Sequence, residues 1–445
     1  MEALGQKEFL KLAVPFTLST VTQPLLGAVD TAVVGRLDSA DFIGGVAIGT
    51  VIFNTLYWLF GFLRVATSGF AAQSLGKNHF DDIAFAWLRP LVIAAGIGLL
   101  FIIVQKAIIT SAMSLYKADP DVTLHALNYF YILIWGAPFV LIGYVNLGWL
   151  MGRGYIREVL ILQVGTNTLN IFLDIFFVMA LHQGVEGVAT ATLISQAAGF
   201  VVGLYFILKK LPVSKLTALL LGIFEGVAMK RLATVNSDLF IRTACLLAMT
   251  NIFVAKGSAM GADILAANAI LFQIQYLIAY LFDGLANAVS VFAGKFVGKE
   301  NFKGFMETRT IADKNMLGLG ILLICGLLLF TEPLLMLFTD LEQVLNLCKR
   351  FSFYLILFIV AMAPGLVYSG FYIGATCSVP IRNSLVAALV FFIPLELLLI
   401  PRFQNHGLWS SFIVFSAMRS LVLYLYWNRM VNQNFVKKDE LSYHR

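Results

Sequence analysis

The polar side chains within the most apolar stretches of this sequence form a pattern suited to handling a proton or a cation. The clearest is Asp174, in the run TLNIFLDIFFVMAL at residues 168–181. Asn170, Asn167 and Gln163 precede it at intervals of three or four residues, so all four share one face if the segment is helical. The amides of Gln163 and Asn167 are expected to form helix-packing hydrogen bonds. A carboxyl group in such surroundings needs a partner charge or a proton.

A second carboxyl group lies in an apolar run near the amino terminus. This run contains Asp30 and Gln23, together with Pro15 and Pro24. Each proline removes a backbone hydrogen-bond donor, so both are candidate hinges. No basic residue lies beside either Asp30 or Asp174 within its own run, and we predict that the two carboxyl groups load and unload a proton.

The second half of the chain carries different charges in its apolar runs. Asp283, in LFDGLANAV, is compatible with a contact to substrate and equally with a pairing to Asn287. Glu396 is expected to be structural, and Arg242 and Arg419 to pair with acidic or backbone groups. Three polar residues are candidate contacts to substrate or to a cavity: Gln23, Asn167 and Asp283.

Composition identifies the elements that position these residues as membrane helices. Of 445 residues, 60% are hydrophobic and 13% are charged, whereas a soluble domain carries about 25% charged residues. Twelve apolar runs are long enough to cross ~30 Å of hydrocarbon, and they do not alternate as barrel strands would. Their centres lie near residues 22, 57, 98, 137, 170, 196, 243, 277, 320, 360, 391 and 419. The sequence therefore predicts an all-α integral membrane protein.

The distribution of Lys and Arg predicts the orientation in the membrane. Most of the 31 basic residues lie on one side if both termini are placed in the cytoplasm. We therefore expect a multi-pass protein of the cell (inner or plasma) membrane, whose net charge of +6 needs no nucleic-acid partner. The four cysteines have no metal-ligand or redox spacing, and we expect no metal and no cofactor.

The chain contains an internal repeat. A shift of 222 residues lays LFGFLRVATSGFAAQSLGK, residues 59–77, over LFDGLANAVSVFAGKFVGK, residues 281–299, with nine of nineteen positions identical. Six crossings per half return the second half to the same orientation, so the repeat is parallel and builds two pseudo-symmetric six-helix bundles. The expected segments are an amino-terminal lobe (1–208), a cytoplasmic linker (209–231), a carboxy-terminal lobe (232–432) and a cytoplasmic tail (433–445).

Three segments of this sequence resemble one transporter family: PLLGAVDTAVVGRLDSADFIGGVAIG, GFLRVATSGFAAQSLGK and NIFLDIFFVMALHQGVEGVATAT. With the duplicated spans, they resemble the multidrug and toxic compound extrusion (MATE) family, in its bacterial DinF-like branch. The resemblance implies efflux of cationic or amphipathic compounds driven by H⁺ or Na⁺. It also implies a coupling network at Asp30, Asn170 and Asp174, and it alone adds Thr192. Relatives that bind Na⁺ in the second lobe use carboxylates on spans seven and ten, whose bodies lack them here.

These observations predict a proton-coupled efflux antiporter that works by alternating access, with Na⁺ coupling less favoured. The predicted partners are small organic substrates and membrane lipids, and the protein is expected to be a monomer. An alternative is a lipid-linked saccharide flippase of the same superfamily, which would favour a strongly cationic central cavity and extra spans. An enzyme is not expected, because the sequence has no phosphate-binding Gly-Lys loop, no HExxH and no nucleophile with a base.

Overall fold

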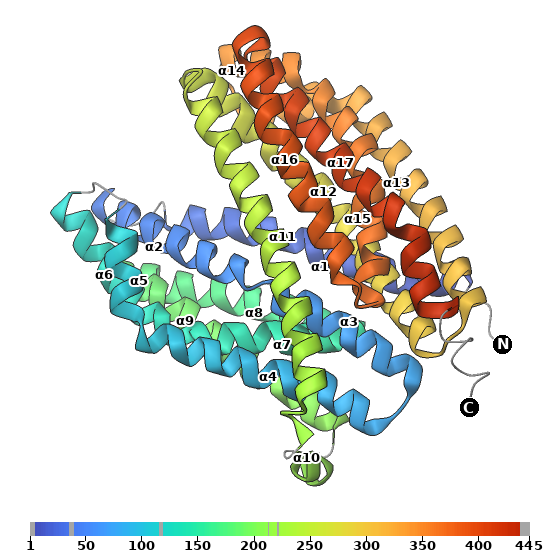
Figure 1. Ribbon diagram of the computed structural model, residues 1–445. Coiled ribbons are helices and arrows are strands. Elements are labelled where there is room, and N and C mark those ends of the chain that lie inside the picture. The colour runs from blue at the N-terminus through green and yellow to red at the C-terminus, as the bar shows by residue number, and fades with distance from the viewer. Residues whose placement is uncertain (1–4, 35–39, 115–118, 212, 220–221, 437–445) are drawn as a thin grey trace. The chain divides into compact units, whose positions relative to one another are not determined.

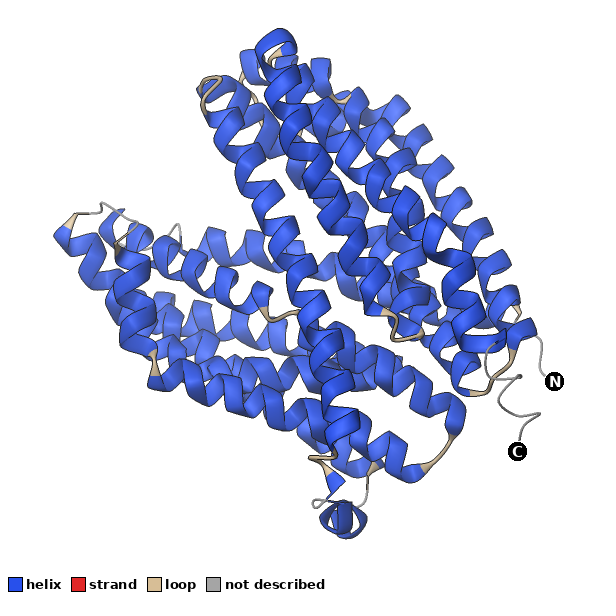
Figure 2. Ribbon diagram, in the orientation of Figure 1, coloured by secondary structure: helices blue, strands red, loops and turns tan. Residues whose placement is uncertain are grey.

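In the computed structural model, all regular secondary structure of the described part is helical (Figures 1 and 2). It describes residues 5–34, 40–114, 119–211, 213–219 and 222–436, without the side chains of residues 21–34, 40, 213–214, 217 and 436. The elements of the amino-terminal half are α1 (Gln6–Val34), α2 (Ala40–Leu59), α3 (Phe62–Lys77), α4 (Phe80–Ile103), α5 (Gln105–Met113), α6 (Pro120–Leu133), η1 (Ile134–Gly136), α7 (Ala137–Gly152), α8 (Ile156–Asp174), η2 (Ile175–Ala180), α9 (Val185–Lys210) and α10 (Val213–Leu219). Those that follow are α11 (Gly226–Ser258), α12 (Ala262–Gly298), α13 (Phe302–Met336), α14 (Glu342–Phe351), α15 (Phe353–Gly374), α16 (Ser378–Phe403), α17 (Asn405–Val431) and η4 (Asn432–Val436).

The expected all-helical membrane architecture is confirmed. Within the described residues, 11 helical segments are long and apolar enough to cross a membrane. The remaining expected span corresponds to α1, which has 29 residues and would extend ~44 Å at 1.5 Å per residue.

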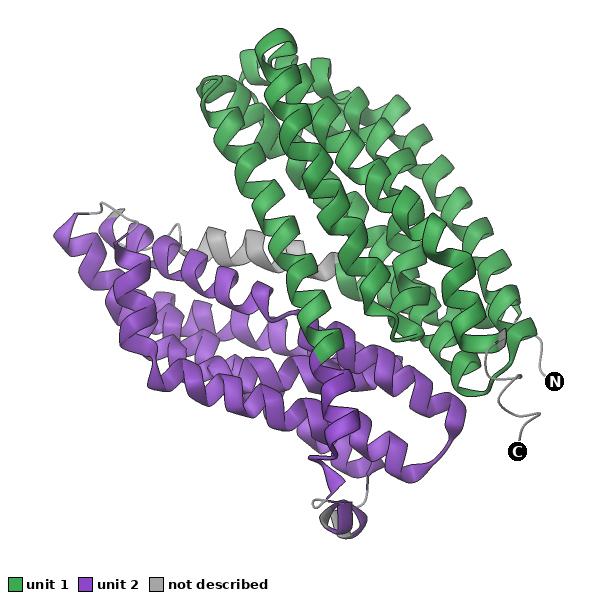
Figure 3. Cartoon of the chain, viewed as in Figure 1, with its two compact units in different colours: residues 1–20, 234–445 green, residues 21–233 purple. Residues whose placement is uncertain are grey.

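The chain divides into two compact units (Figure 3). We call residues 21–233 the first unit and residues 1–20 with 234–445 the second unit. The amino-terminal part of α1 thus groups with the later helices, and the end of the expected linker is already helical, because α11 begins at Gly226. The lobe boundaries predicted from the sequence stay a prediction.

The sequence repeat has a structural counterpart in how closely two pairs of helices pack. In the first unit, a Cβ added to Gly148 of α7 would lie 2.4 Å from the backbone oxygen of Arg64 on α3. A Cβ added to Gly152 would lie 2.2 Å from the backbone oxygen of Ser68, also on α3. In the second unit, Gly370 and Gly374 of α15 stand 222 residues later and face α12. Their added Cβ atoms would lie 2.3 and 2.4 Å from the carbonyl oxygens of residues 286 and 290. The same shift relates all four contacts, so each unit contains one copy of this packing.

Adding a methyl group at this contact should destabilise the protein. Gly374→Ala would place Cβ 2.4 Å from the Ser290 oxygen and 2.7 Å from the Gly294 nitrogen, and overpacking of this kind costs about 1–3 kcal/mol. The expected result is a lower unfolding temperature in detergent. Gly318→Ala on α13 is the control, because nothing lies within 4 Å of its added Cβ. An equal effect of the two substitutions would refute the close-packing explanation.

Two of the expected spans are interrupted. The second consists of α2 and α3, which are separated by a turn at Phe60 and Gly61. The fourth passes through the 3₁₀ turn η1, which ends directly before Ala137 and Pro138 at the start of α7. A proline cannot donate the hydrogen bond of a continuing α-helix, so the chain re-enters the helix there with the proline in its first turn.

Candidate functional site

The polar stripe predicted from the sequence lies on α8, which packs against α9 in the first unit. Asp174 is 3% exposed and Asn170 is 7% exposed. Asn170 Nδ2 donates a long hydrogen bond of 3.4 Å to Thr192 Oγ1 on α9, and that hydroxyl donates to the Val188 oxygen at 3.0 Å. The structure therefore brings together Asn170 and Thr192, which were selected on different grounds.

The helix changes its winding directly after Asp174. Residues 175–180 form the π-helical segment η2, in which the Leu181 N–H donates to the Phe176 oxygen. π turns are rare and occur often at functional sites. Asp174 is therefore buried directly before a helical irregularity.

The other predicted site residues differ in how far the structure describes them. Gln163 and Asn167 are half-buried on α8, and Pro15 is half-buried on α1. The side chains of Gln23, Pro24 and Asp30 lie outside the described residues. The contact between Asp30 and Asp174 and the hinge roles of the two prolines stay predictions.

The structure adds polar residues that the sequence analysis did not select. Gln196 lies one helical turn after Thr192 on α9, and its buried Oε1 has no hydrogen-bond partner in the described part of the chain. Tyr57 is 9% exposed and lies close to Tyr144. The four-residue spacing from Thr192 is a signal that could have found Gln196. The tyrosines had no such signal, because aromatic residues are common in every span.

The second unit holds a basic cluster instead. Arg419, on α17, is 5% exposed, and its Nε and Nη2 atoms have no hydrogen-bond partner within the described residues. Asp283 of α12 and Arg242 of α11 both interact electrostatically with it. Asn287 Nδ2 also has no hydrogen-bond partner there. Asp283 therefore interacts with Arg419 and not with Asn287. Two cationic side chains, those of Arg419 and Arg242, therefore lie close to each other in this cluster.

Two acidic residues of the second unit are held in ion pairs. Asp238 lies within α11 and is 2% exposed. It accepts hydrogen bonds from Arg382 Nη1 at 2.7 Å and Ser378 Oγ at 2.6 Å. Glu396 Oε2 lies 3.3 Å from Lys256 Nζ, in line with the structural role expected for Glu396. Span seven thus carries a carboxylate just before its apolar body, but an arginine neutralises it.

Metal-binding and thiol chemistry find little support in the described part of the chain. There, no three His, Cys, Asp or Glu side chains gather in a way that could hold a metal ion. Cys348 of α14 is buried, and burial raises the pKa of its thiol to about 11, so it stays protonated at neutral pH. The absence of a metal or cofactor stays a prediction.

Comparison with known proteins identifies the family. The MatE family model matches this chain in two blocks, residues 15–176 and 239–398, which together exceed half of its length. The chain belongs to the MatE family. It is therefore a member of the MATE multidrug efflux transporters, as the sequence resemblance implied. Its placement among transporters rather than enzymes rests on this membership.

Curated relatives support the same family. DNA damage-inducible protein F of Escherichia coli is 34% identical over 425 residues, covering 96% of this chain and 92% of that protein. The probable multidrug resistance protein NorM of Thermotoga maritima is 25% identical over 362 residues, covering 77% of this chain and 74% of the relative. The first of these also fits the DinF-like branch that the sequence resembles.

Solved structures agree with the fold. A structure described as MATE in the bent conformation matches with a TM-score of 0.84 and 21% sequence identity, covering 97% of both chains. At this identity the likeness concerns the fold alone. The MATE structures have 12 membrane helices, and this chain is a multi-pass membrane protein of the same architecture.

Proposed function

We propose that this MATE protein exports cationic or amphipathic organic compounds in exchange for protons. The observation that carries the proposal is the burial of Asp174, at 3% exposure, beside the Asn170–Thr192 contact between α8 and α9. A carboxyl group in the membrane interior is costly to keep charged, so it is rarely present without a role in moving ions or substrate.

In the proposed cycle, protonation of Asp174 from the outside removes a negative charge that attracts a cationic compound. The substrate is then held less tightly and leaves, and release of the proton to the cytoplasm resets the site. Asn170 and Thr192 keep the carboxyl-bearing face of α8 against α9. Asp30 is the proposed second carboxyl group of the network.

The basic cluster of the second unit supports assignment of the cation chemistry to the first unit. A metal cation near Arg419 and Arg242 would meet two like charges and one carboxylate, that of Asp283. Like charges in a medium of low dielectric repel strongly. Asp238 is also engaged by Arg382. These contacts disfavour a Na⁺ site in the second unit and favour protons as the coupling ion.

A dye-efflux measurement tests the proposal directly. Proteoliposomes carrying the purified protein and ethidium are given either a proton gradient or a Na⁺ gradient of equal size. Each charge that moves through 100 mV supplies ~2.3 kcal/mol. We expect transport with the proton gradient and no transport with the Na⁺ gradient. Transport that follows Na⁺ and ignores pH would contradict proton coupling.

The arginine cluster is also the feature most compatible with the flippase alternative, because an anionic lipid-linked saccharide needs cationic contacts. The same vesicles separate the two functions. An antiporter moves ethidium and leaves a fluorescent lipid-linked pyrophosphate in its original leaflet, whereas a flippase gives the reverse result.

The remaining expectations belong to the same proposal. We infer that the protein works as a monomer in the inner or plasma membrane, with both termini in the cytoplasm and without a cofactor. The excess of Lys and Arg on one side supports this orientation. Its substrates are small organic molecules, and membrane lipids are its other partners.

A further inference from the structure

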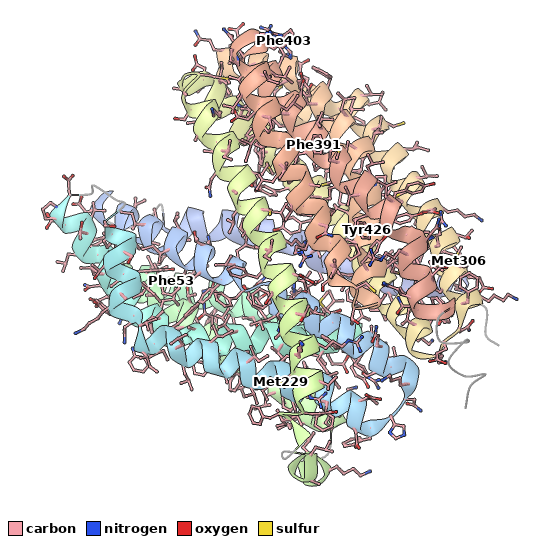
Figure 4. The ribbon with its side chains drawn as sticks, viewed as in Figure 1. Phe53, Met229, Met306, Phe391, Phe403 and Tyr426 are labelled. Atoms are coloured by element: carbon pink, nitrogen blue, oxygen red, sulfur yellow. The ribbon has the colours of Figure 1, made fainter. Side chains whose placement is uncertain are left out.

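A small basic cavity lies at one end of the first unit, where α3, α4 and the beginning of α11 meet. Its volume is about 120 Å³, and its lining includes the cationic side chains of Lys77, Arg89 and Arg231, together with the carboxylate of Asp82. Met229, labelled in Figure 4, marks this turn of α11. None of its lining residues belongs to α8 or α9, so the cavity is distinct from the site at Asp174.

Two of the cations are placed to reach a ligand. Arg231 Nη2 donates a long hydrogen bond of 3.4 Å to Gln73 Oε1, and its guanidinium carbon lies 5.5 Å from the centre of the Phe70 ring. Lys77 Nζ lies 3.3 Å from Asp82 Oδ1, with the two side chains 50% and 45% exposed. Such exposed ion pairs are weak, so an incoming anion can compete for Lys77.

The third cation shapes the rim of the cavity. Arg89 donates hydrogen bonds of 3.1 and 3.2 Å to two carbonyl oxygens of the segment 222–225, and one of 2.9 Å to the carboxylate of Glu225. Within and just after this segment, two apolar side chains face outward. Phe224 is 68% exposed and Val227 is 81% exposed. Apolar side chains beside a basic cavity at a membrane surface are typical of contact with lipid.

The cavity is unsuited to the organic cations that the protein is proposed to export. The lining has three cationic side chains and one carboxylate, and a second carboxylate, that of Glu225, is paired with Arg89. One positive charge remains in excess, which disfavours a cation. The volume is also well below the roughly 300–1,000 Å³ of pockets for drug-sized ligands. Arg and Lys are instead the residues that bind phosphate groups by charge-assisted hydrogen bonds.

We propose that this cavity binds the phosphate headgroup of an anionic phospholipid. Arg231 and Lys77 contact the phosphate, and Phe224 and Val227 lie in the adjoining membrane interface. The bound lipid links α3 and α4 to the beginning of α11, the helix that leads into the second unit. Lipid binding is therefore expected to stabilise the folded protein without taking part in the chemistry at Asp174.

Binding can be measured with the full-length protein in neutral detergent. The two probes are phosphatidylglycerol and phosphatidylcholine of equal chain length, with bound lipid counted by native mass spectrometry and stability followed by the unfolding temperature. We expect preferential binding of phosphatidylglycerol and a higher unfolding temperature with it. Arg231→Gln and Lys77→Gln should each weaken this binding about tenfold, the loss of one charge-assisted hydrogen bond.

Matched controls separate the cavity from general surface charge. Lys230 precedes Arg231 in the sequence but does not line the cavity. Lys230→Gln should therefore leave lipid binding unchanged. Inorganic phosphate in lipid-free micelles should not raise the unfolding temperature. Equal binding of the two lipids, equal loss in the Lys230→Gln and Arg231→Gln proteins, or a stabilisation reproduced by phosphate alone would each overturn the proposal.

Discussion

Asp174→Asn is expected to abolish proton-driven dye efflux while leaving a folded protein in the membrane. Asparagine has nearly the shape of aspartate and keeps a polar side chain beside Asn170, but it cannot gain or lose a proton. The substitution therefore removes the proposed coupling and retains the packing of α8 against α9. Efflux of ethidium from proteoliposomes under a pH gradient measures the effect, and the unfolding temperature verifies the fold.

The matched control is Asp121→Asn, at an exposed carboxylate in the first turn of α6, which should transport as well as the unchanged protein. Asp30→Asn tests the proposed second carboxyl group in the same assay. If both Asp30→Asn and Asp174→Asn transported normally, proton coupling through this network would be wrong. Loss of transport in the Asp121→Asn protein as well would show that the assay reports general damage.

The sequence predicts the repeat well because the repeat has a simple steric cause. Gly152 and Gly374 are 222 residues apart, and at both positions the helices approach too closely for a Cβ. The residues that form polar pairs in one unit cannot be predicted from those of the other unit in the same way. Trp87 donates to Asn146 at 2.9 Å in the first unit, whereas the residues 222 later are Arg309 and Tyr368, joined at 3.1 Å. The backbone arrangement is repeated while the chemistry of the contact has changed.

For the candidate site, the sequence predicts which residues share one face of a helix, but it does not predict which residues of different helices contact each other. Helical spacing placed Asn170 and Asp174 on one stripe, and both are buried. It could not show that Asp283 and Arg419, on α12 and α17, would interact, because periodicity describes one helix at a time. Nor could it predict the π turn after Asp174, since the residues IFFVMA are ordinary for a membrane helix.

The ion pair between α11 and α16 should contribute substantially to the stability of the second unit. Asp238 is 2% exposed, and Arg382 Nη1 lies 2.7 Å from its Oδ1. Arg382 also donates to Asn383 Oδ1, and the Asn383 amide donates to the hydroxyl of Tyr426 on α17, labelled in Figure 4. The arginine thus connects three helices through a continuous hydrogen-bond chain.

Arg382→Met is therefore expected to destabilise the protein by about 3 kcal/mol, because it leaves a buried carboxylate without its cation. Ser378 Oγ still donates to Asp238, which keeps the expected loss at the low end for a buried pair. Adding Asp238→Asn to Arg382→Met should recover part of the stability, since the uncompensated charge is then gone. Unfolding in detergent, followed by circular dichroism, measures all three proteins.

An exposed pair of the same unit provides the comparison. Lys349 Nζ lies 2.6 Å from Glu332 Oε1, with the two side chains 36% and 56% exposed, so Lys349→Met should cost less than about 1 kcal/mol. The N–O distance of the Lys349–Glu332 pair is shorter than that of the Arg382–Asp238 pair. A ranking by distance alone would therefore predict the larger loss of stability for Lys349→Met, which makes the test strict. If Lys349→Met were as destabilising as Arg382→Met, burial of Asp238 would not be the cause of the effect.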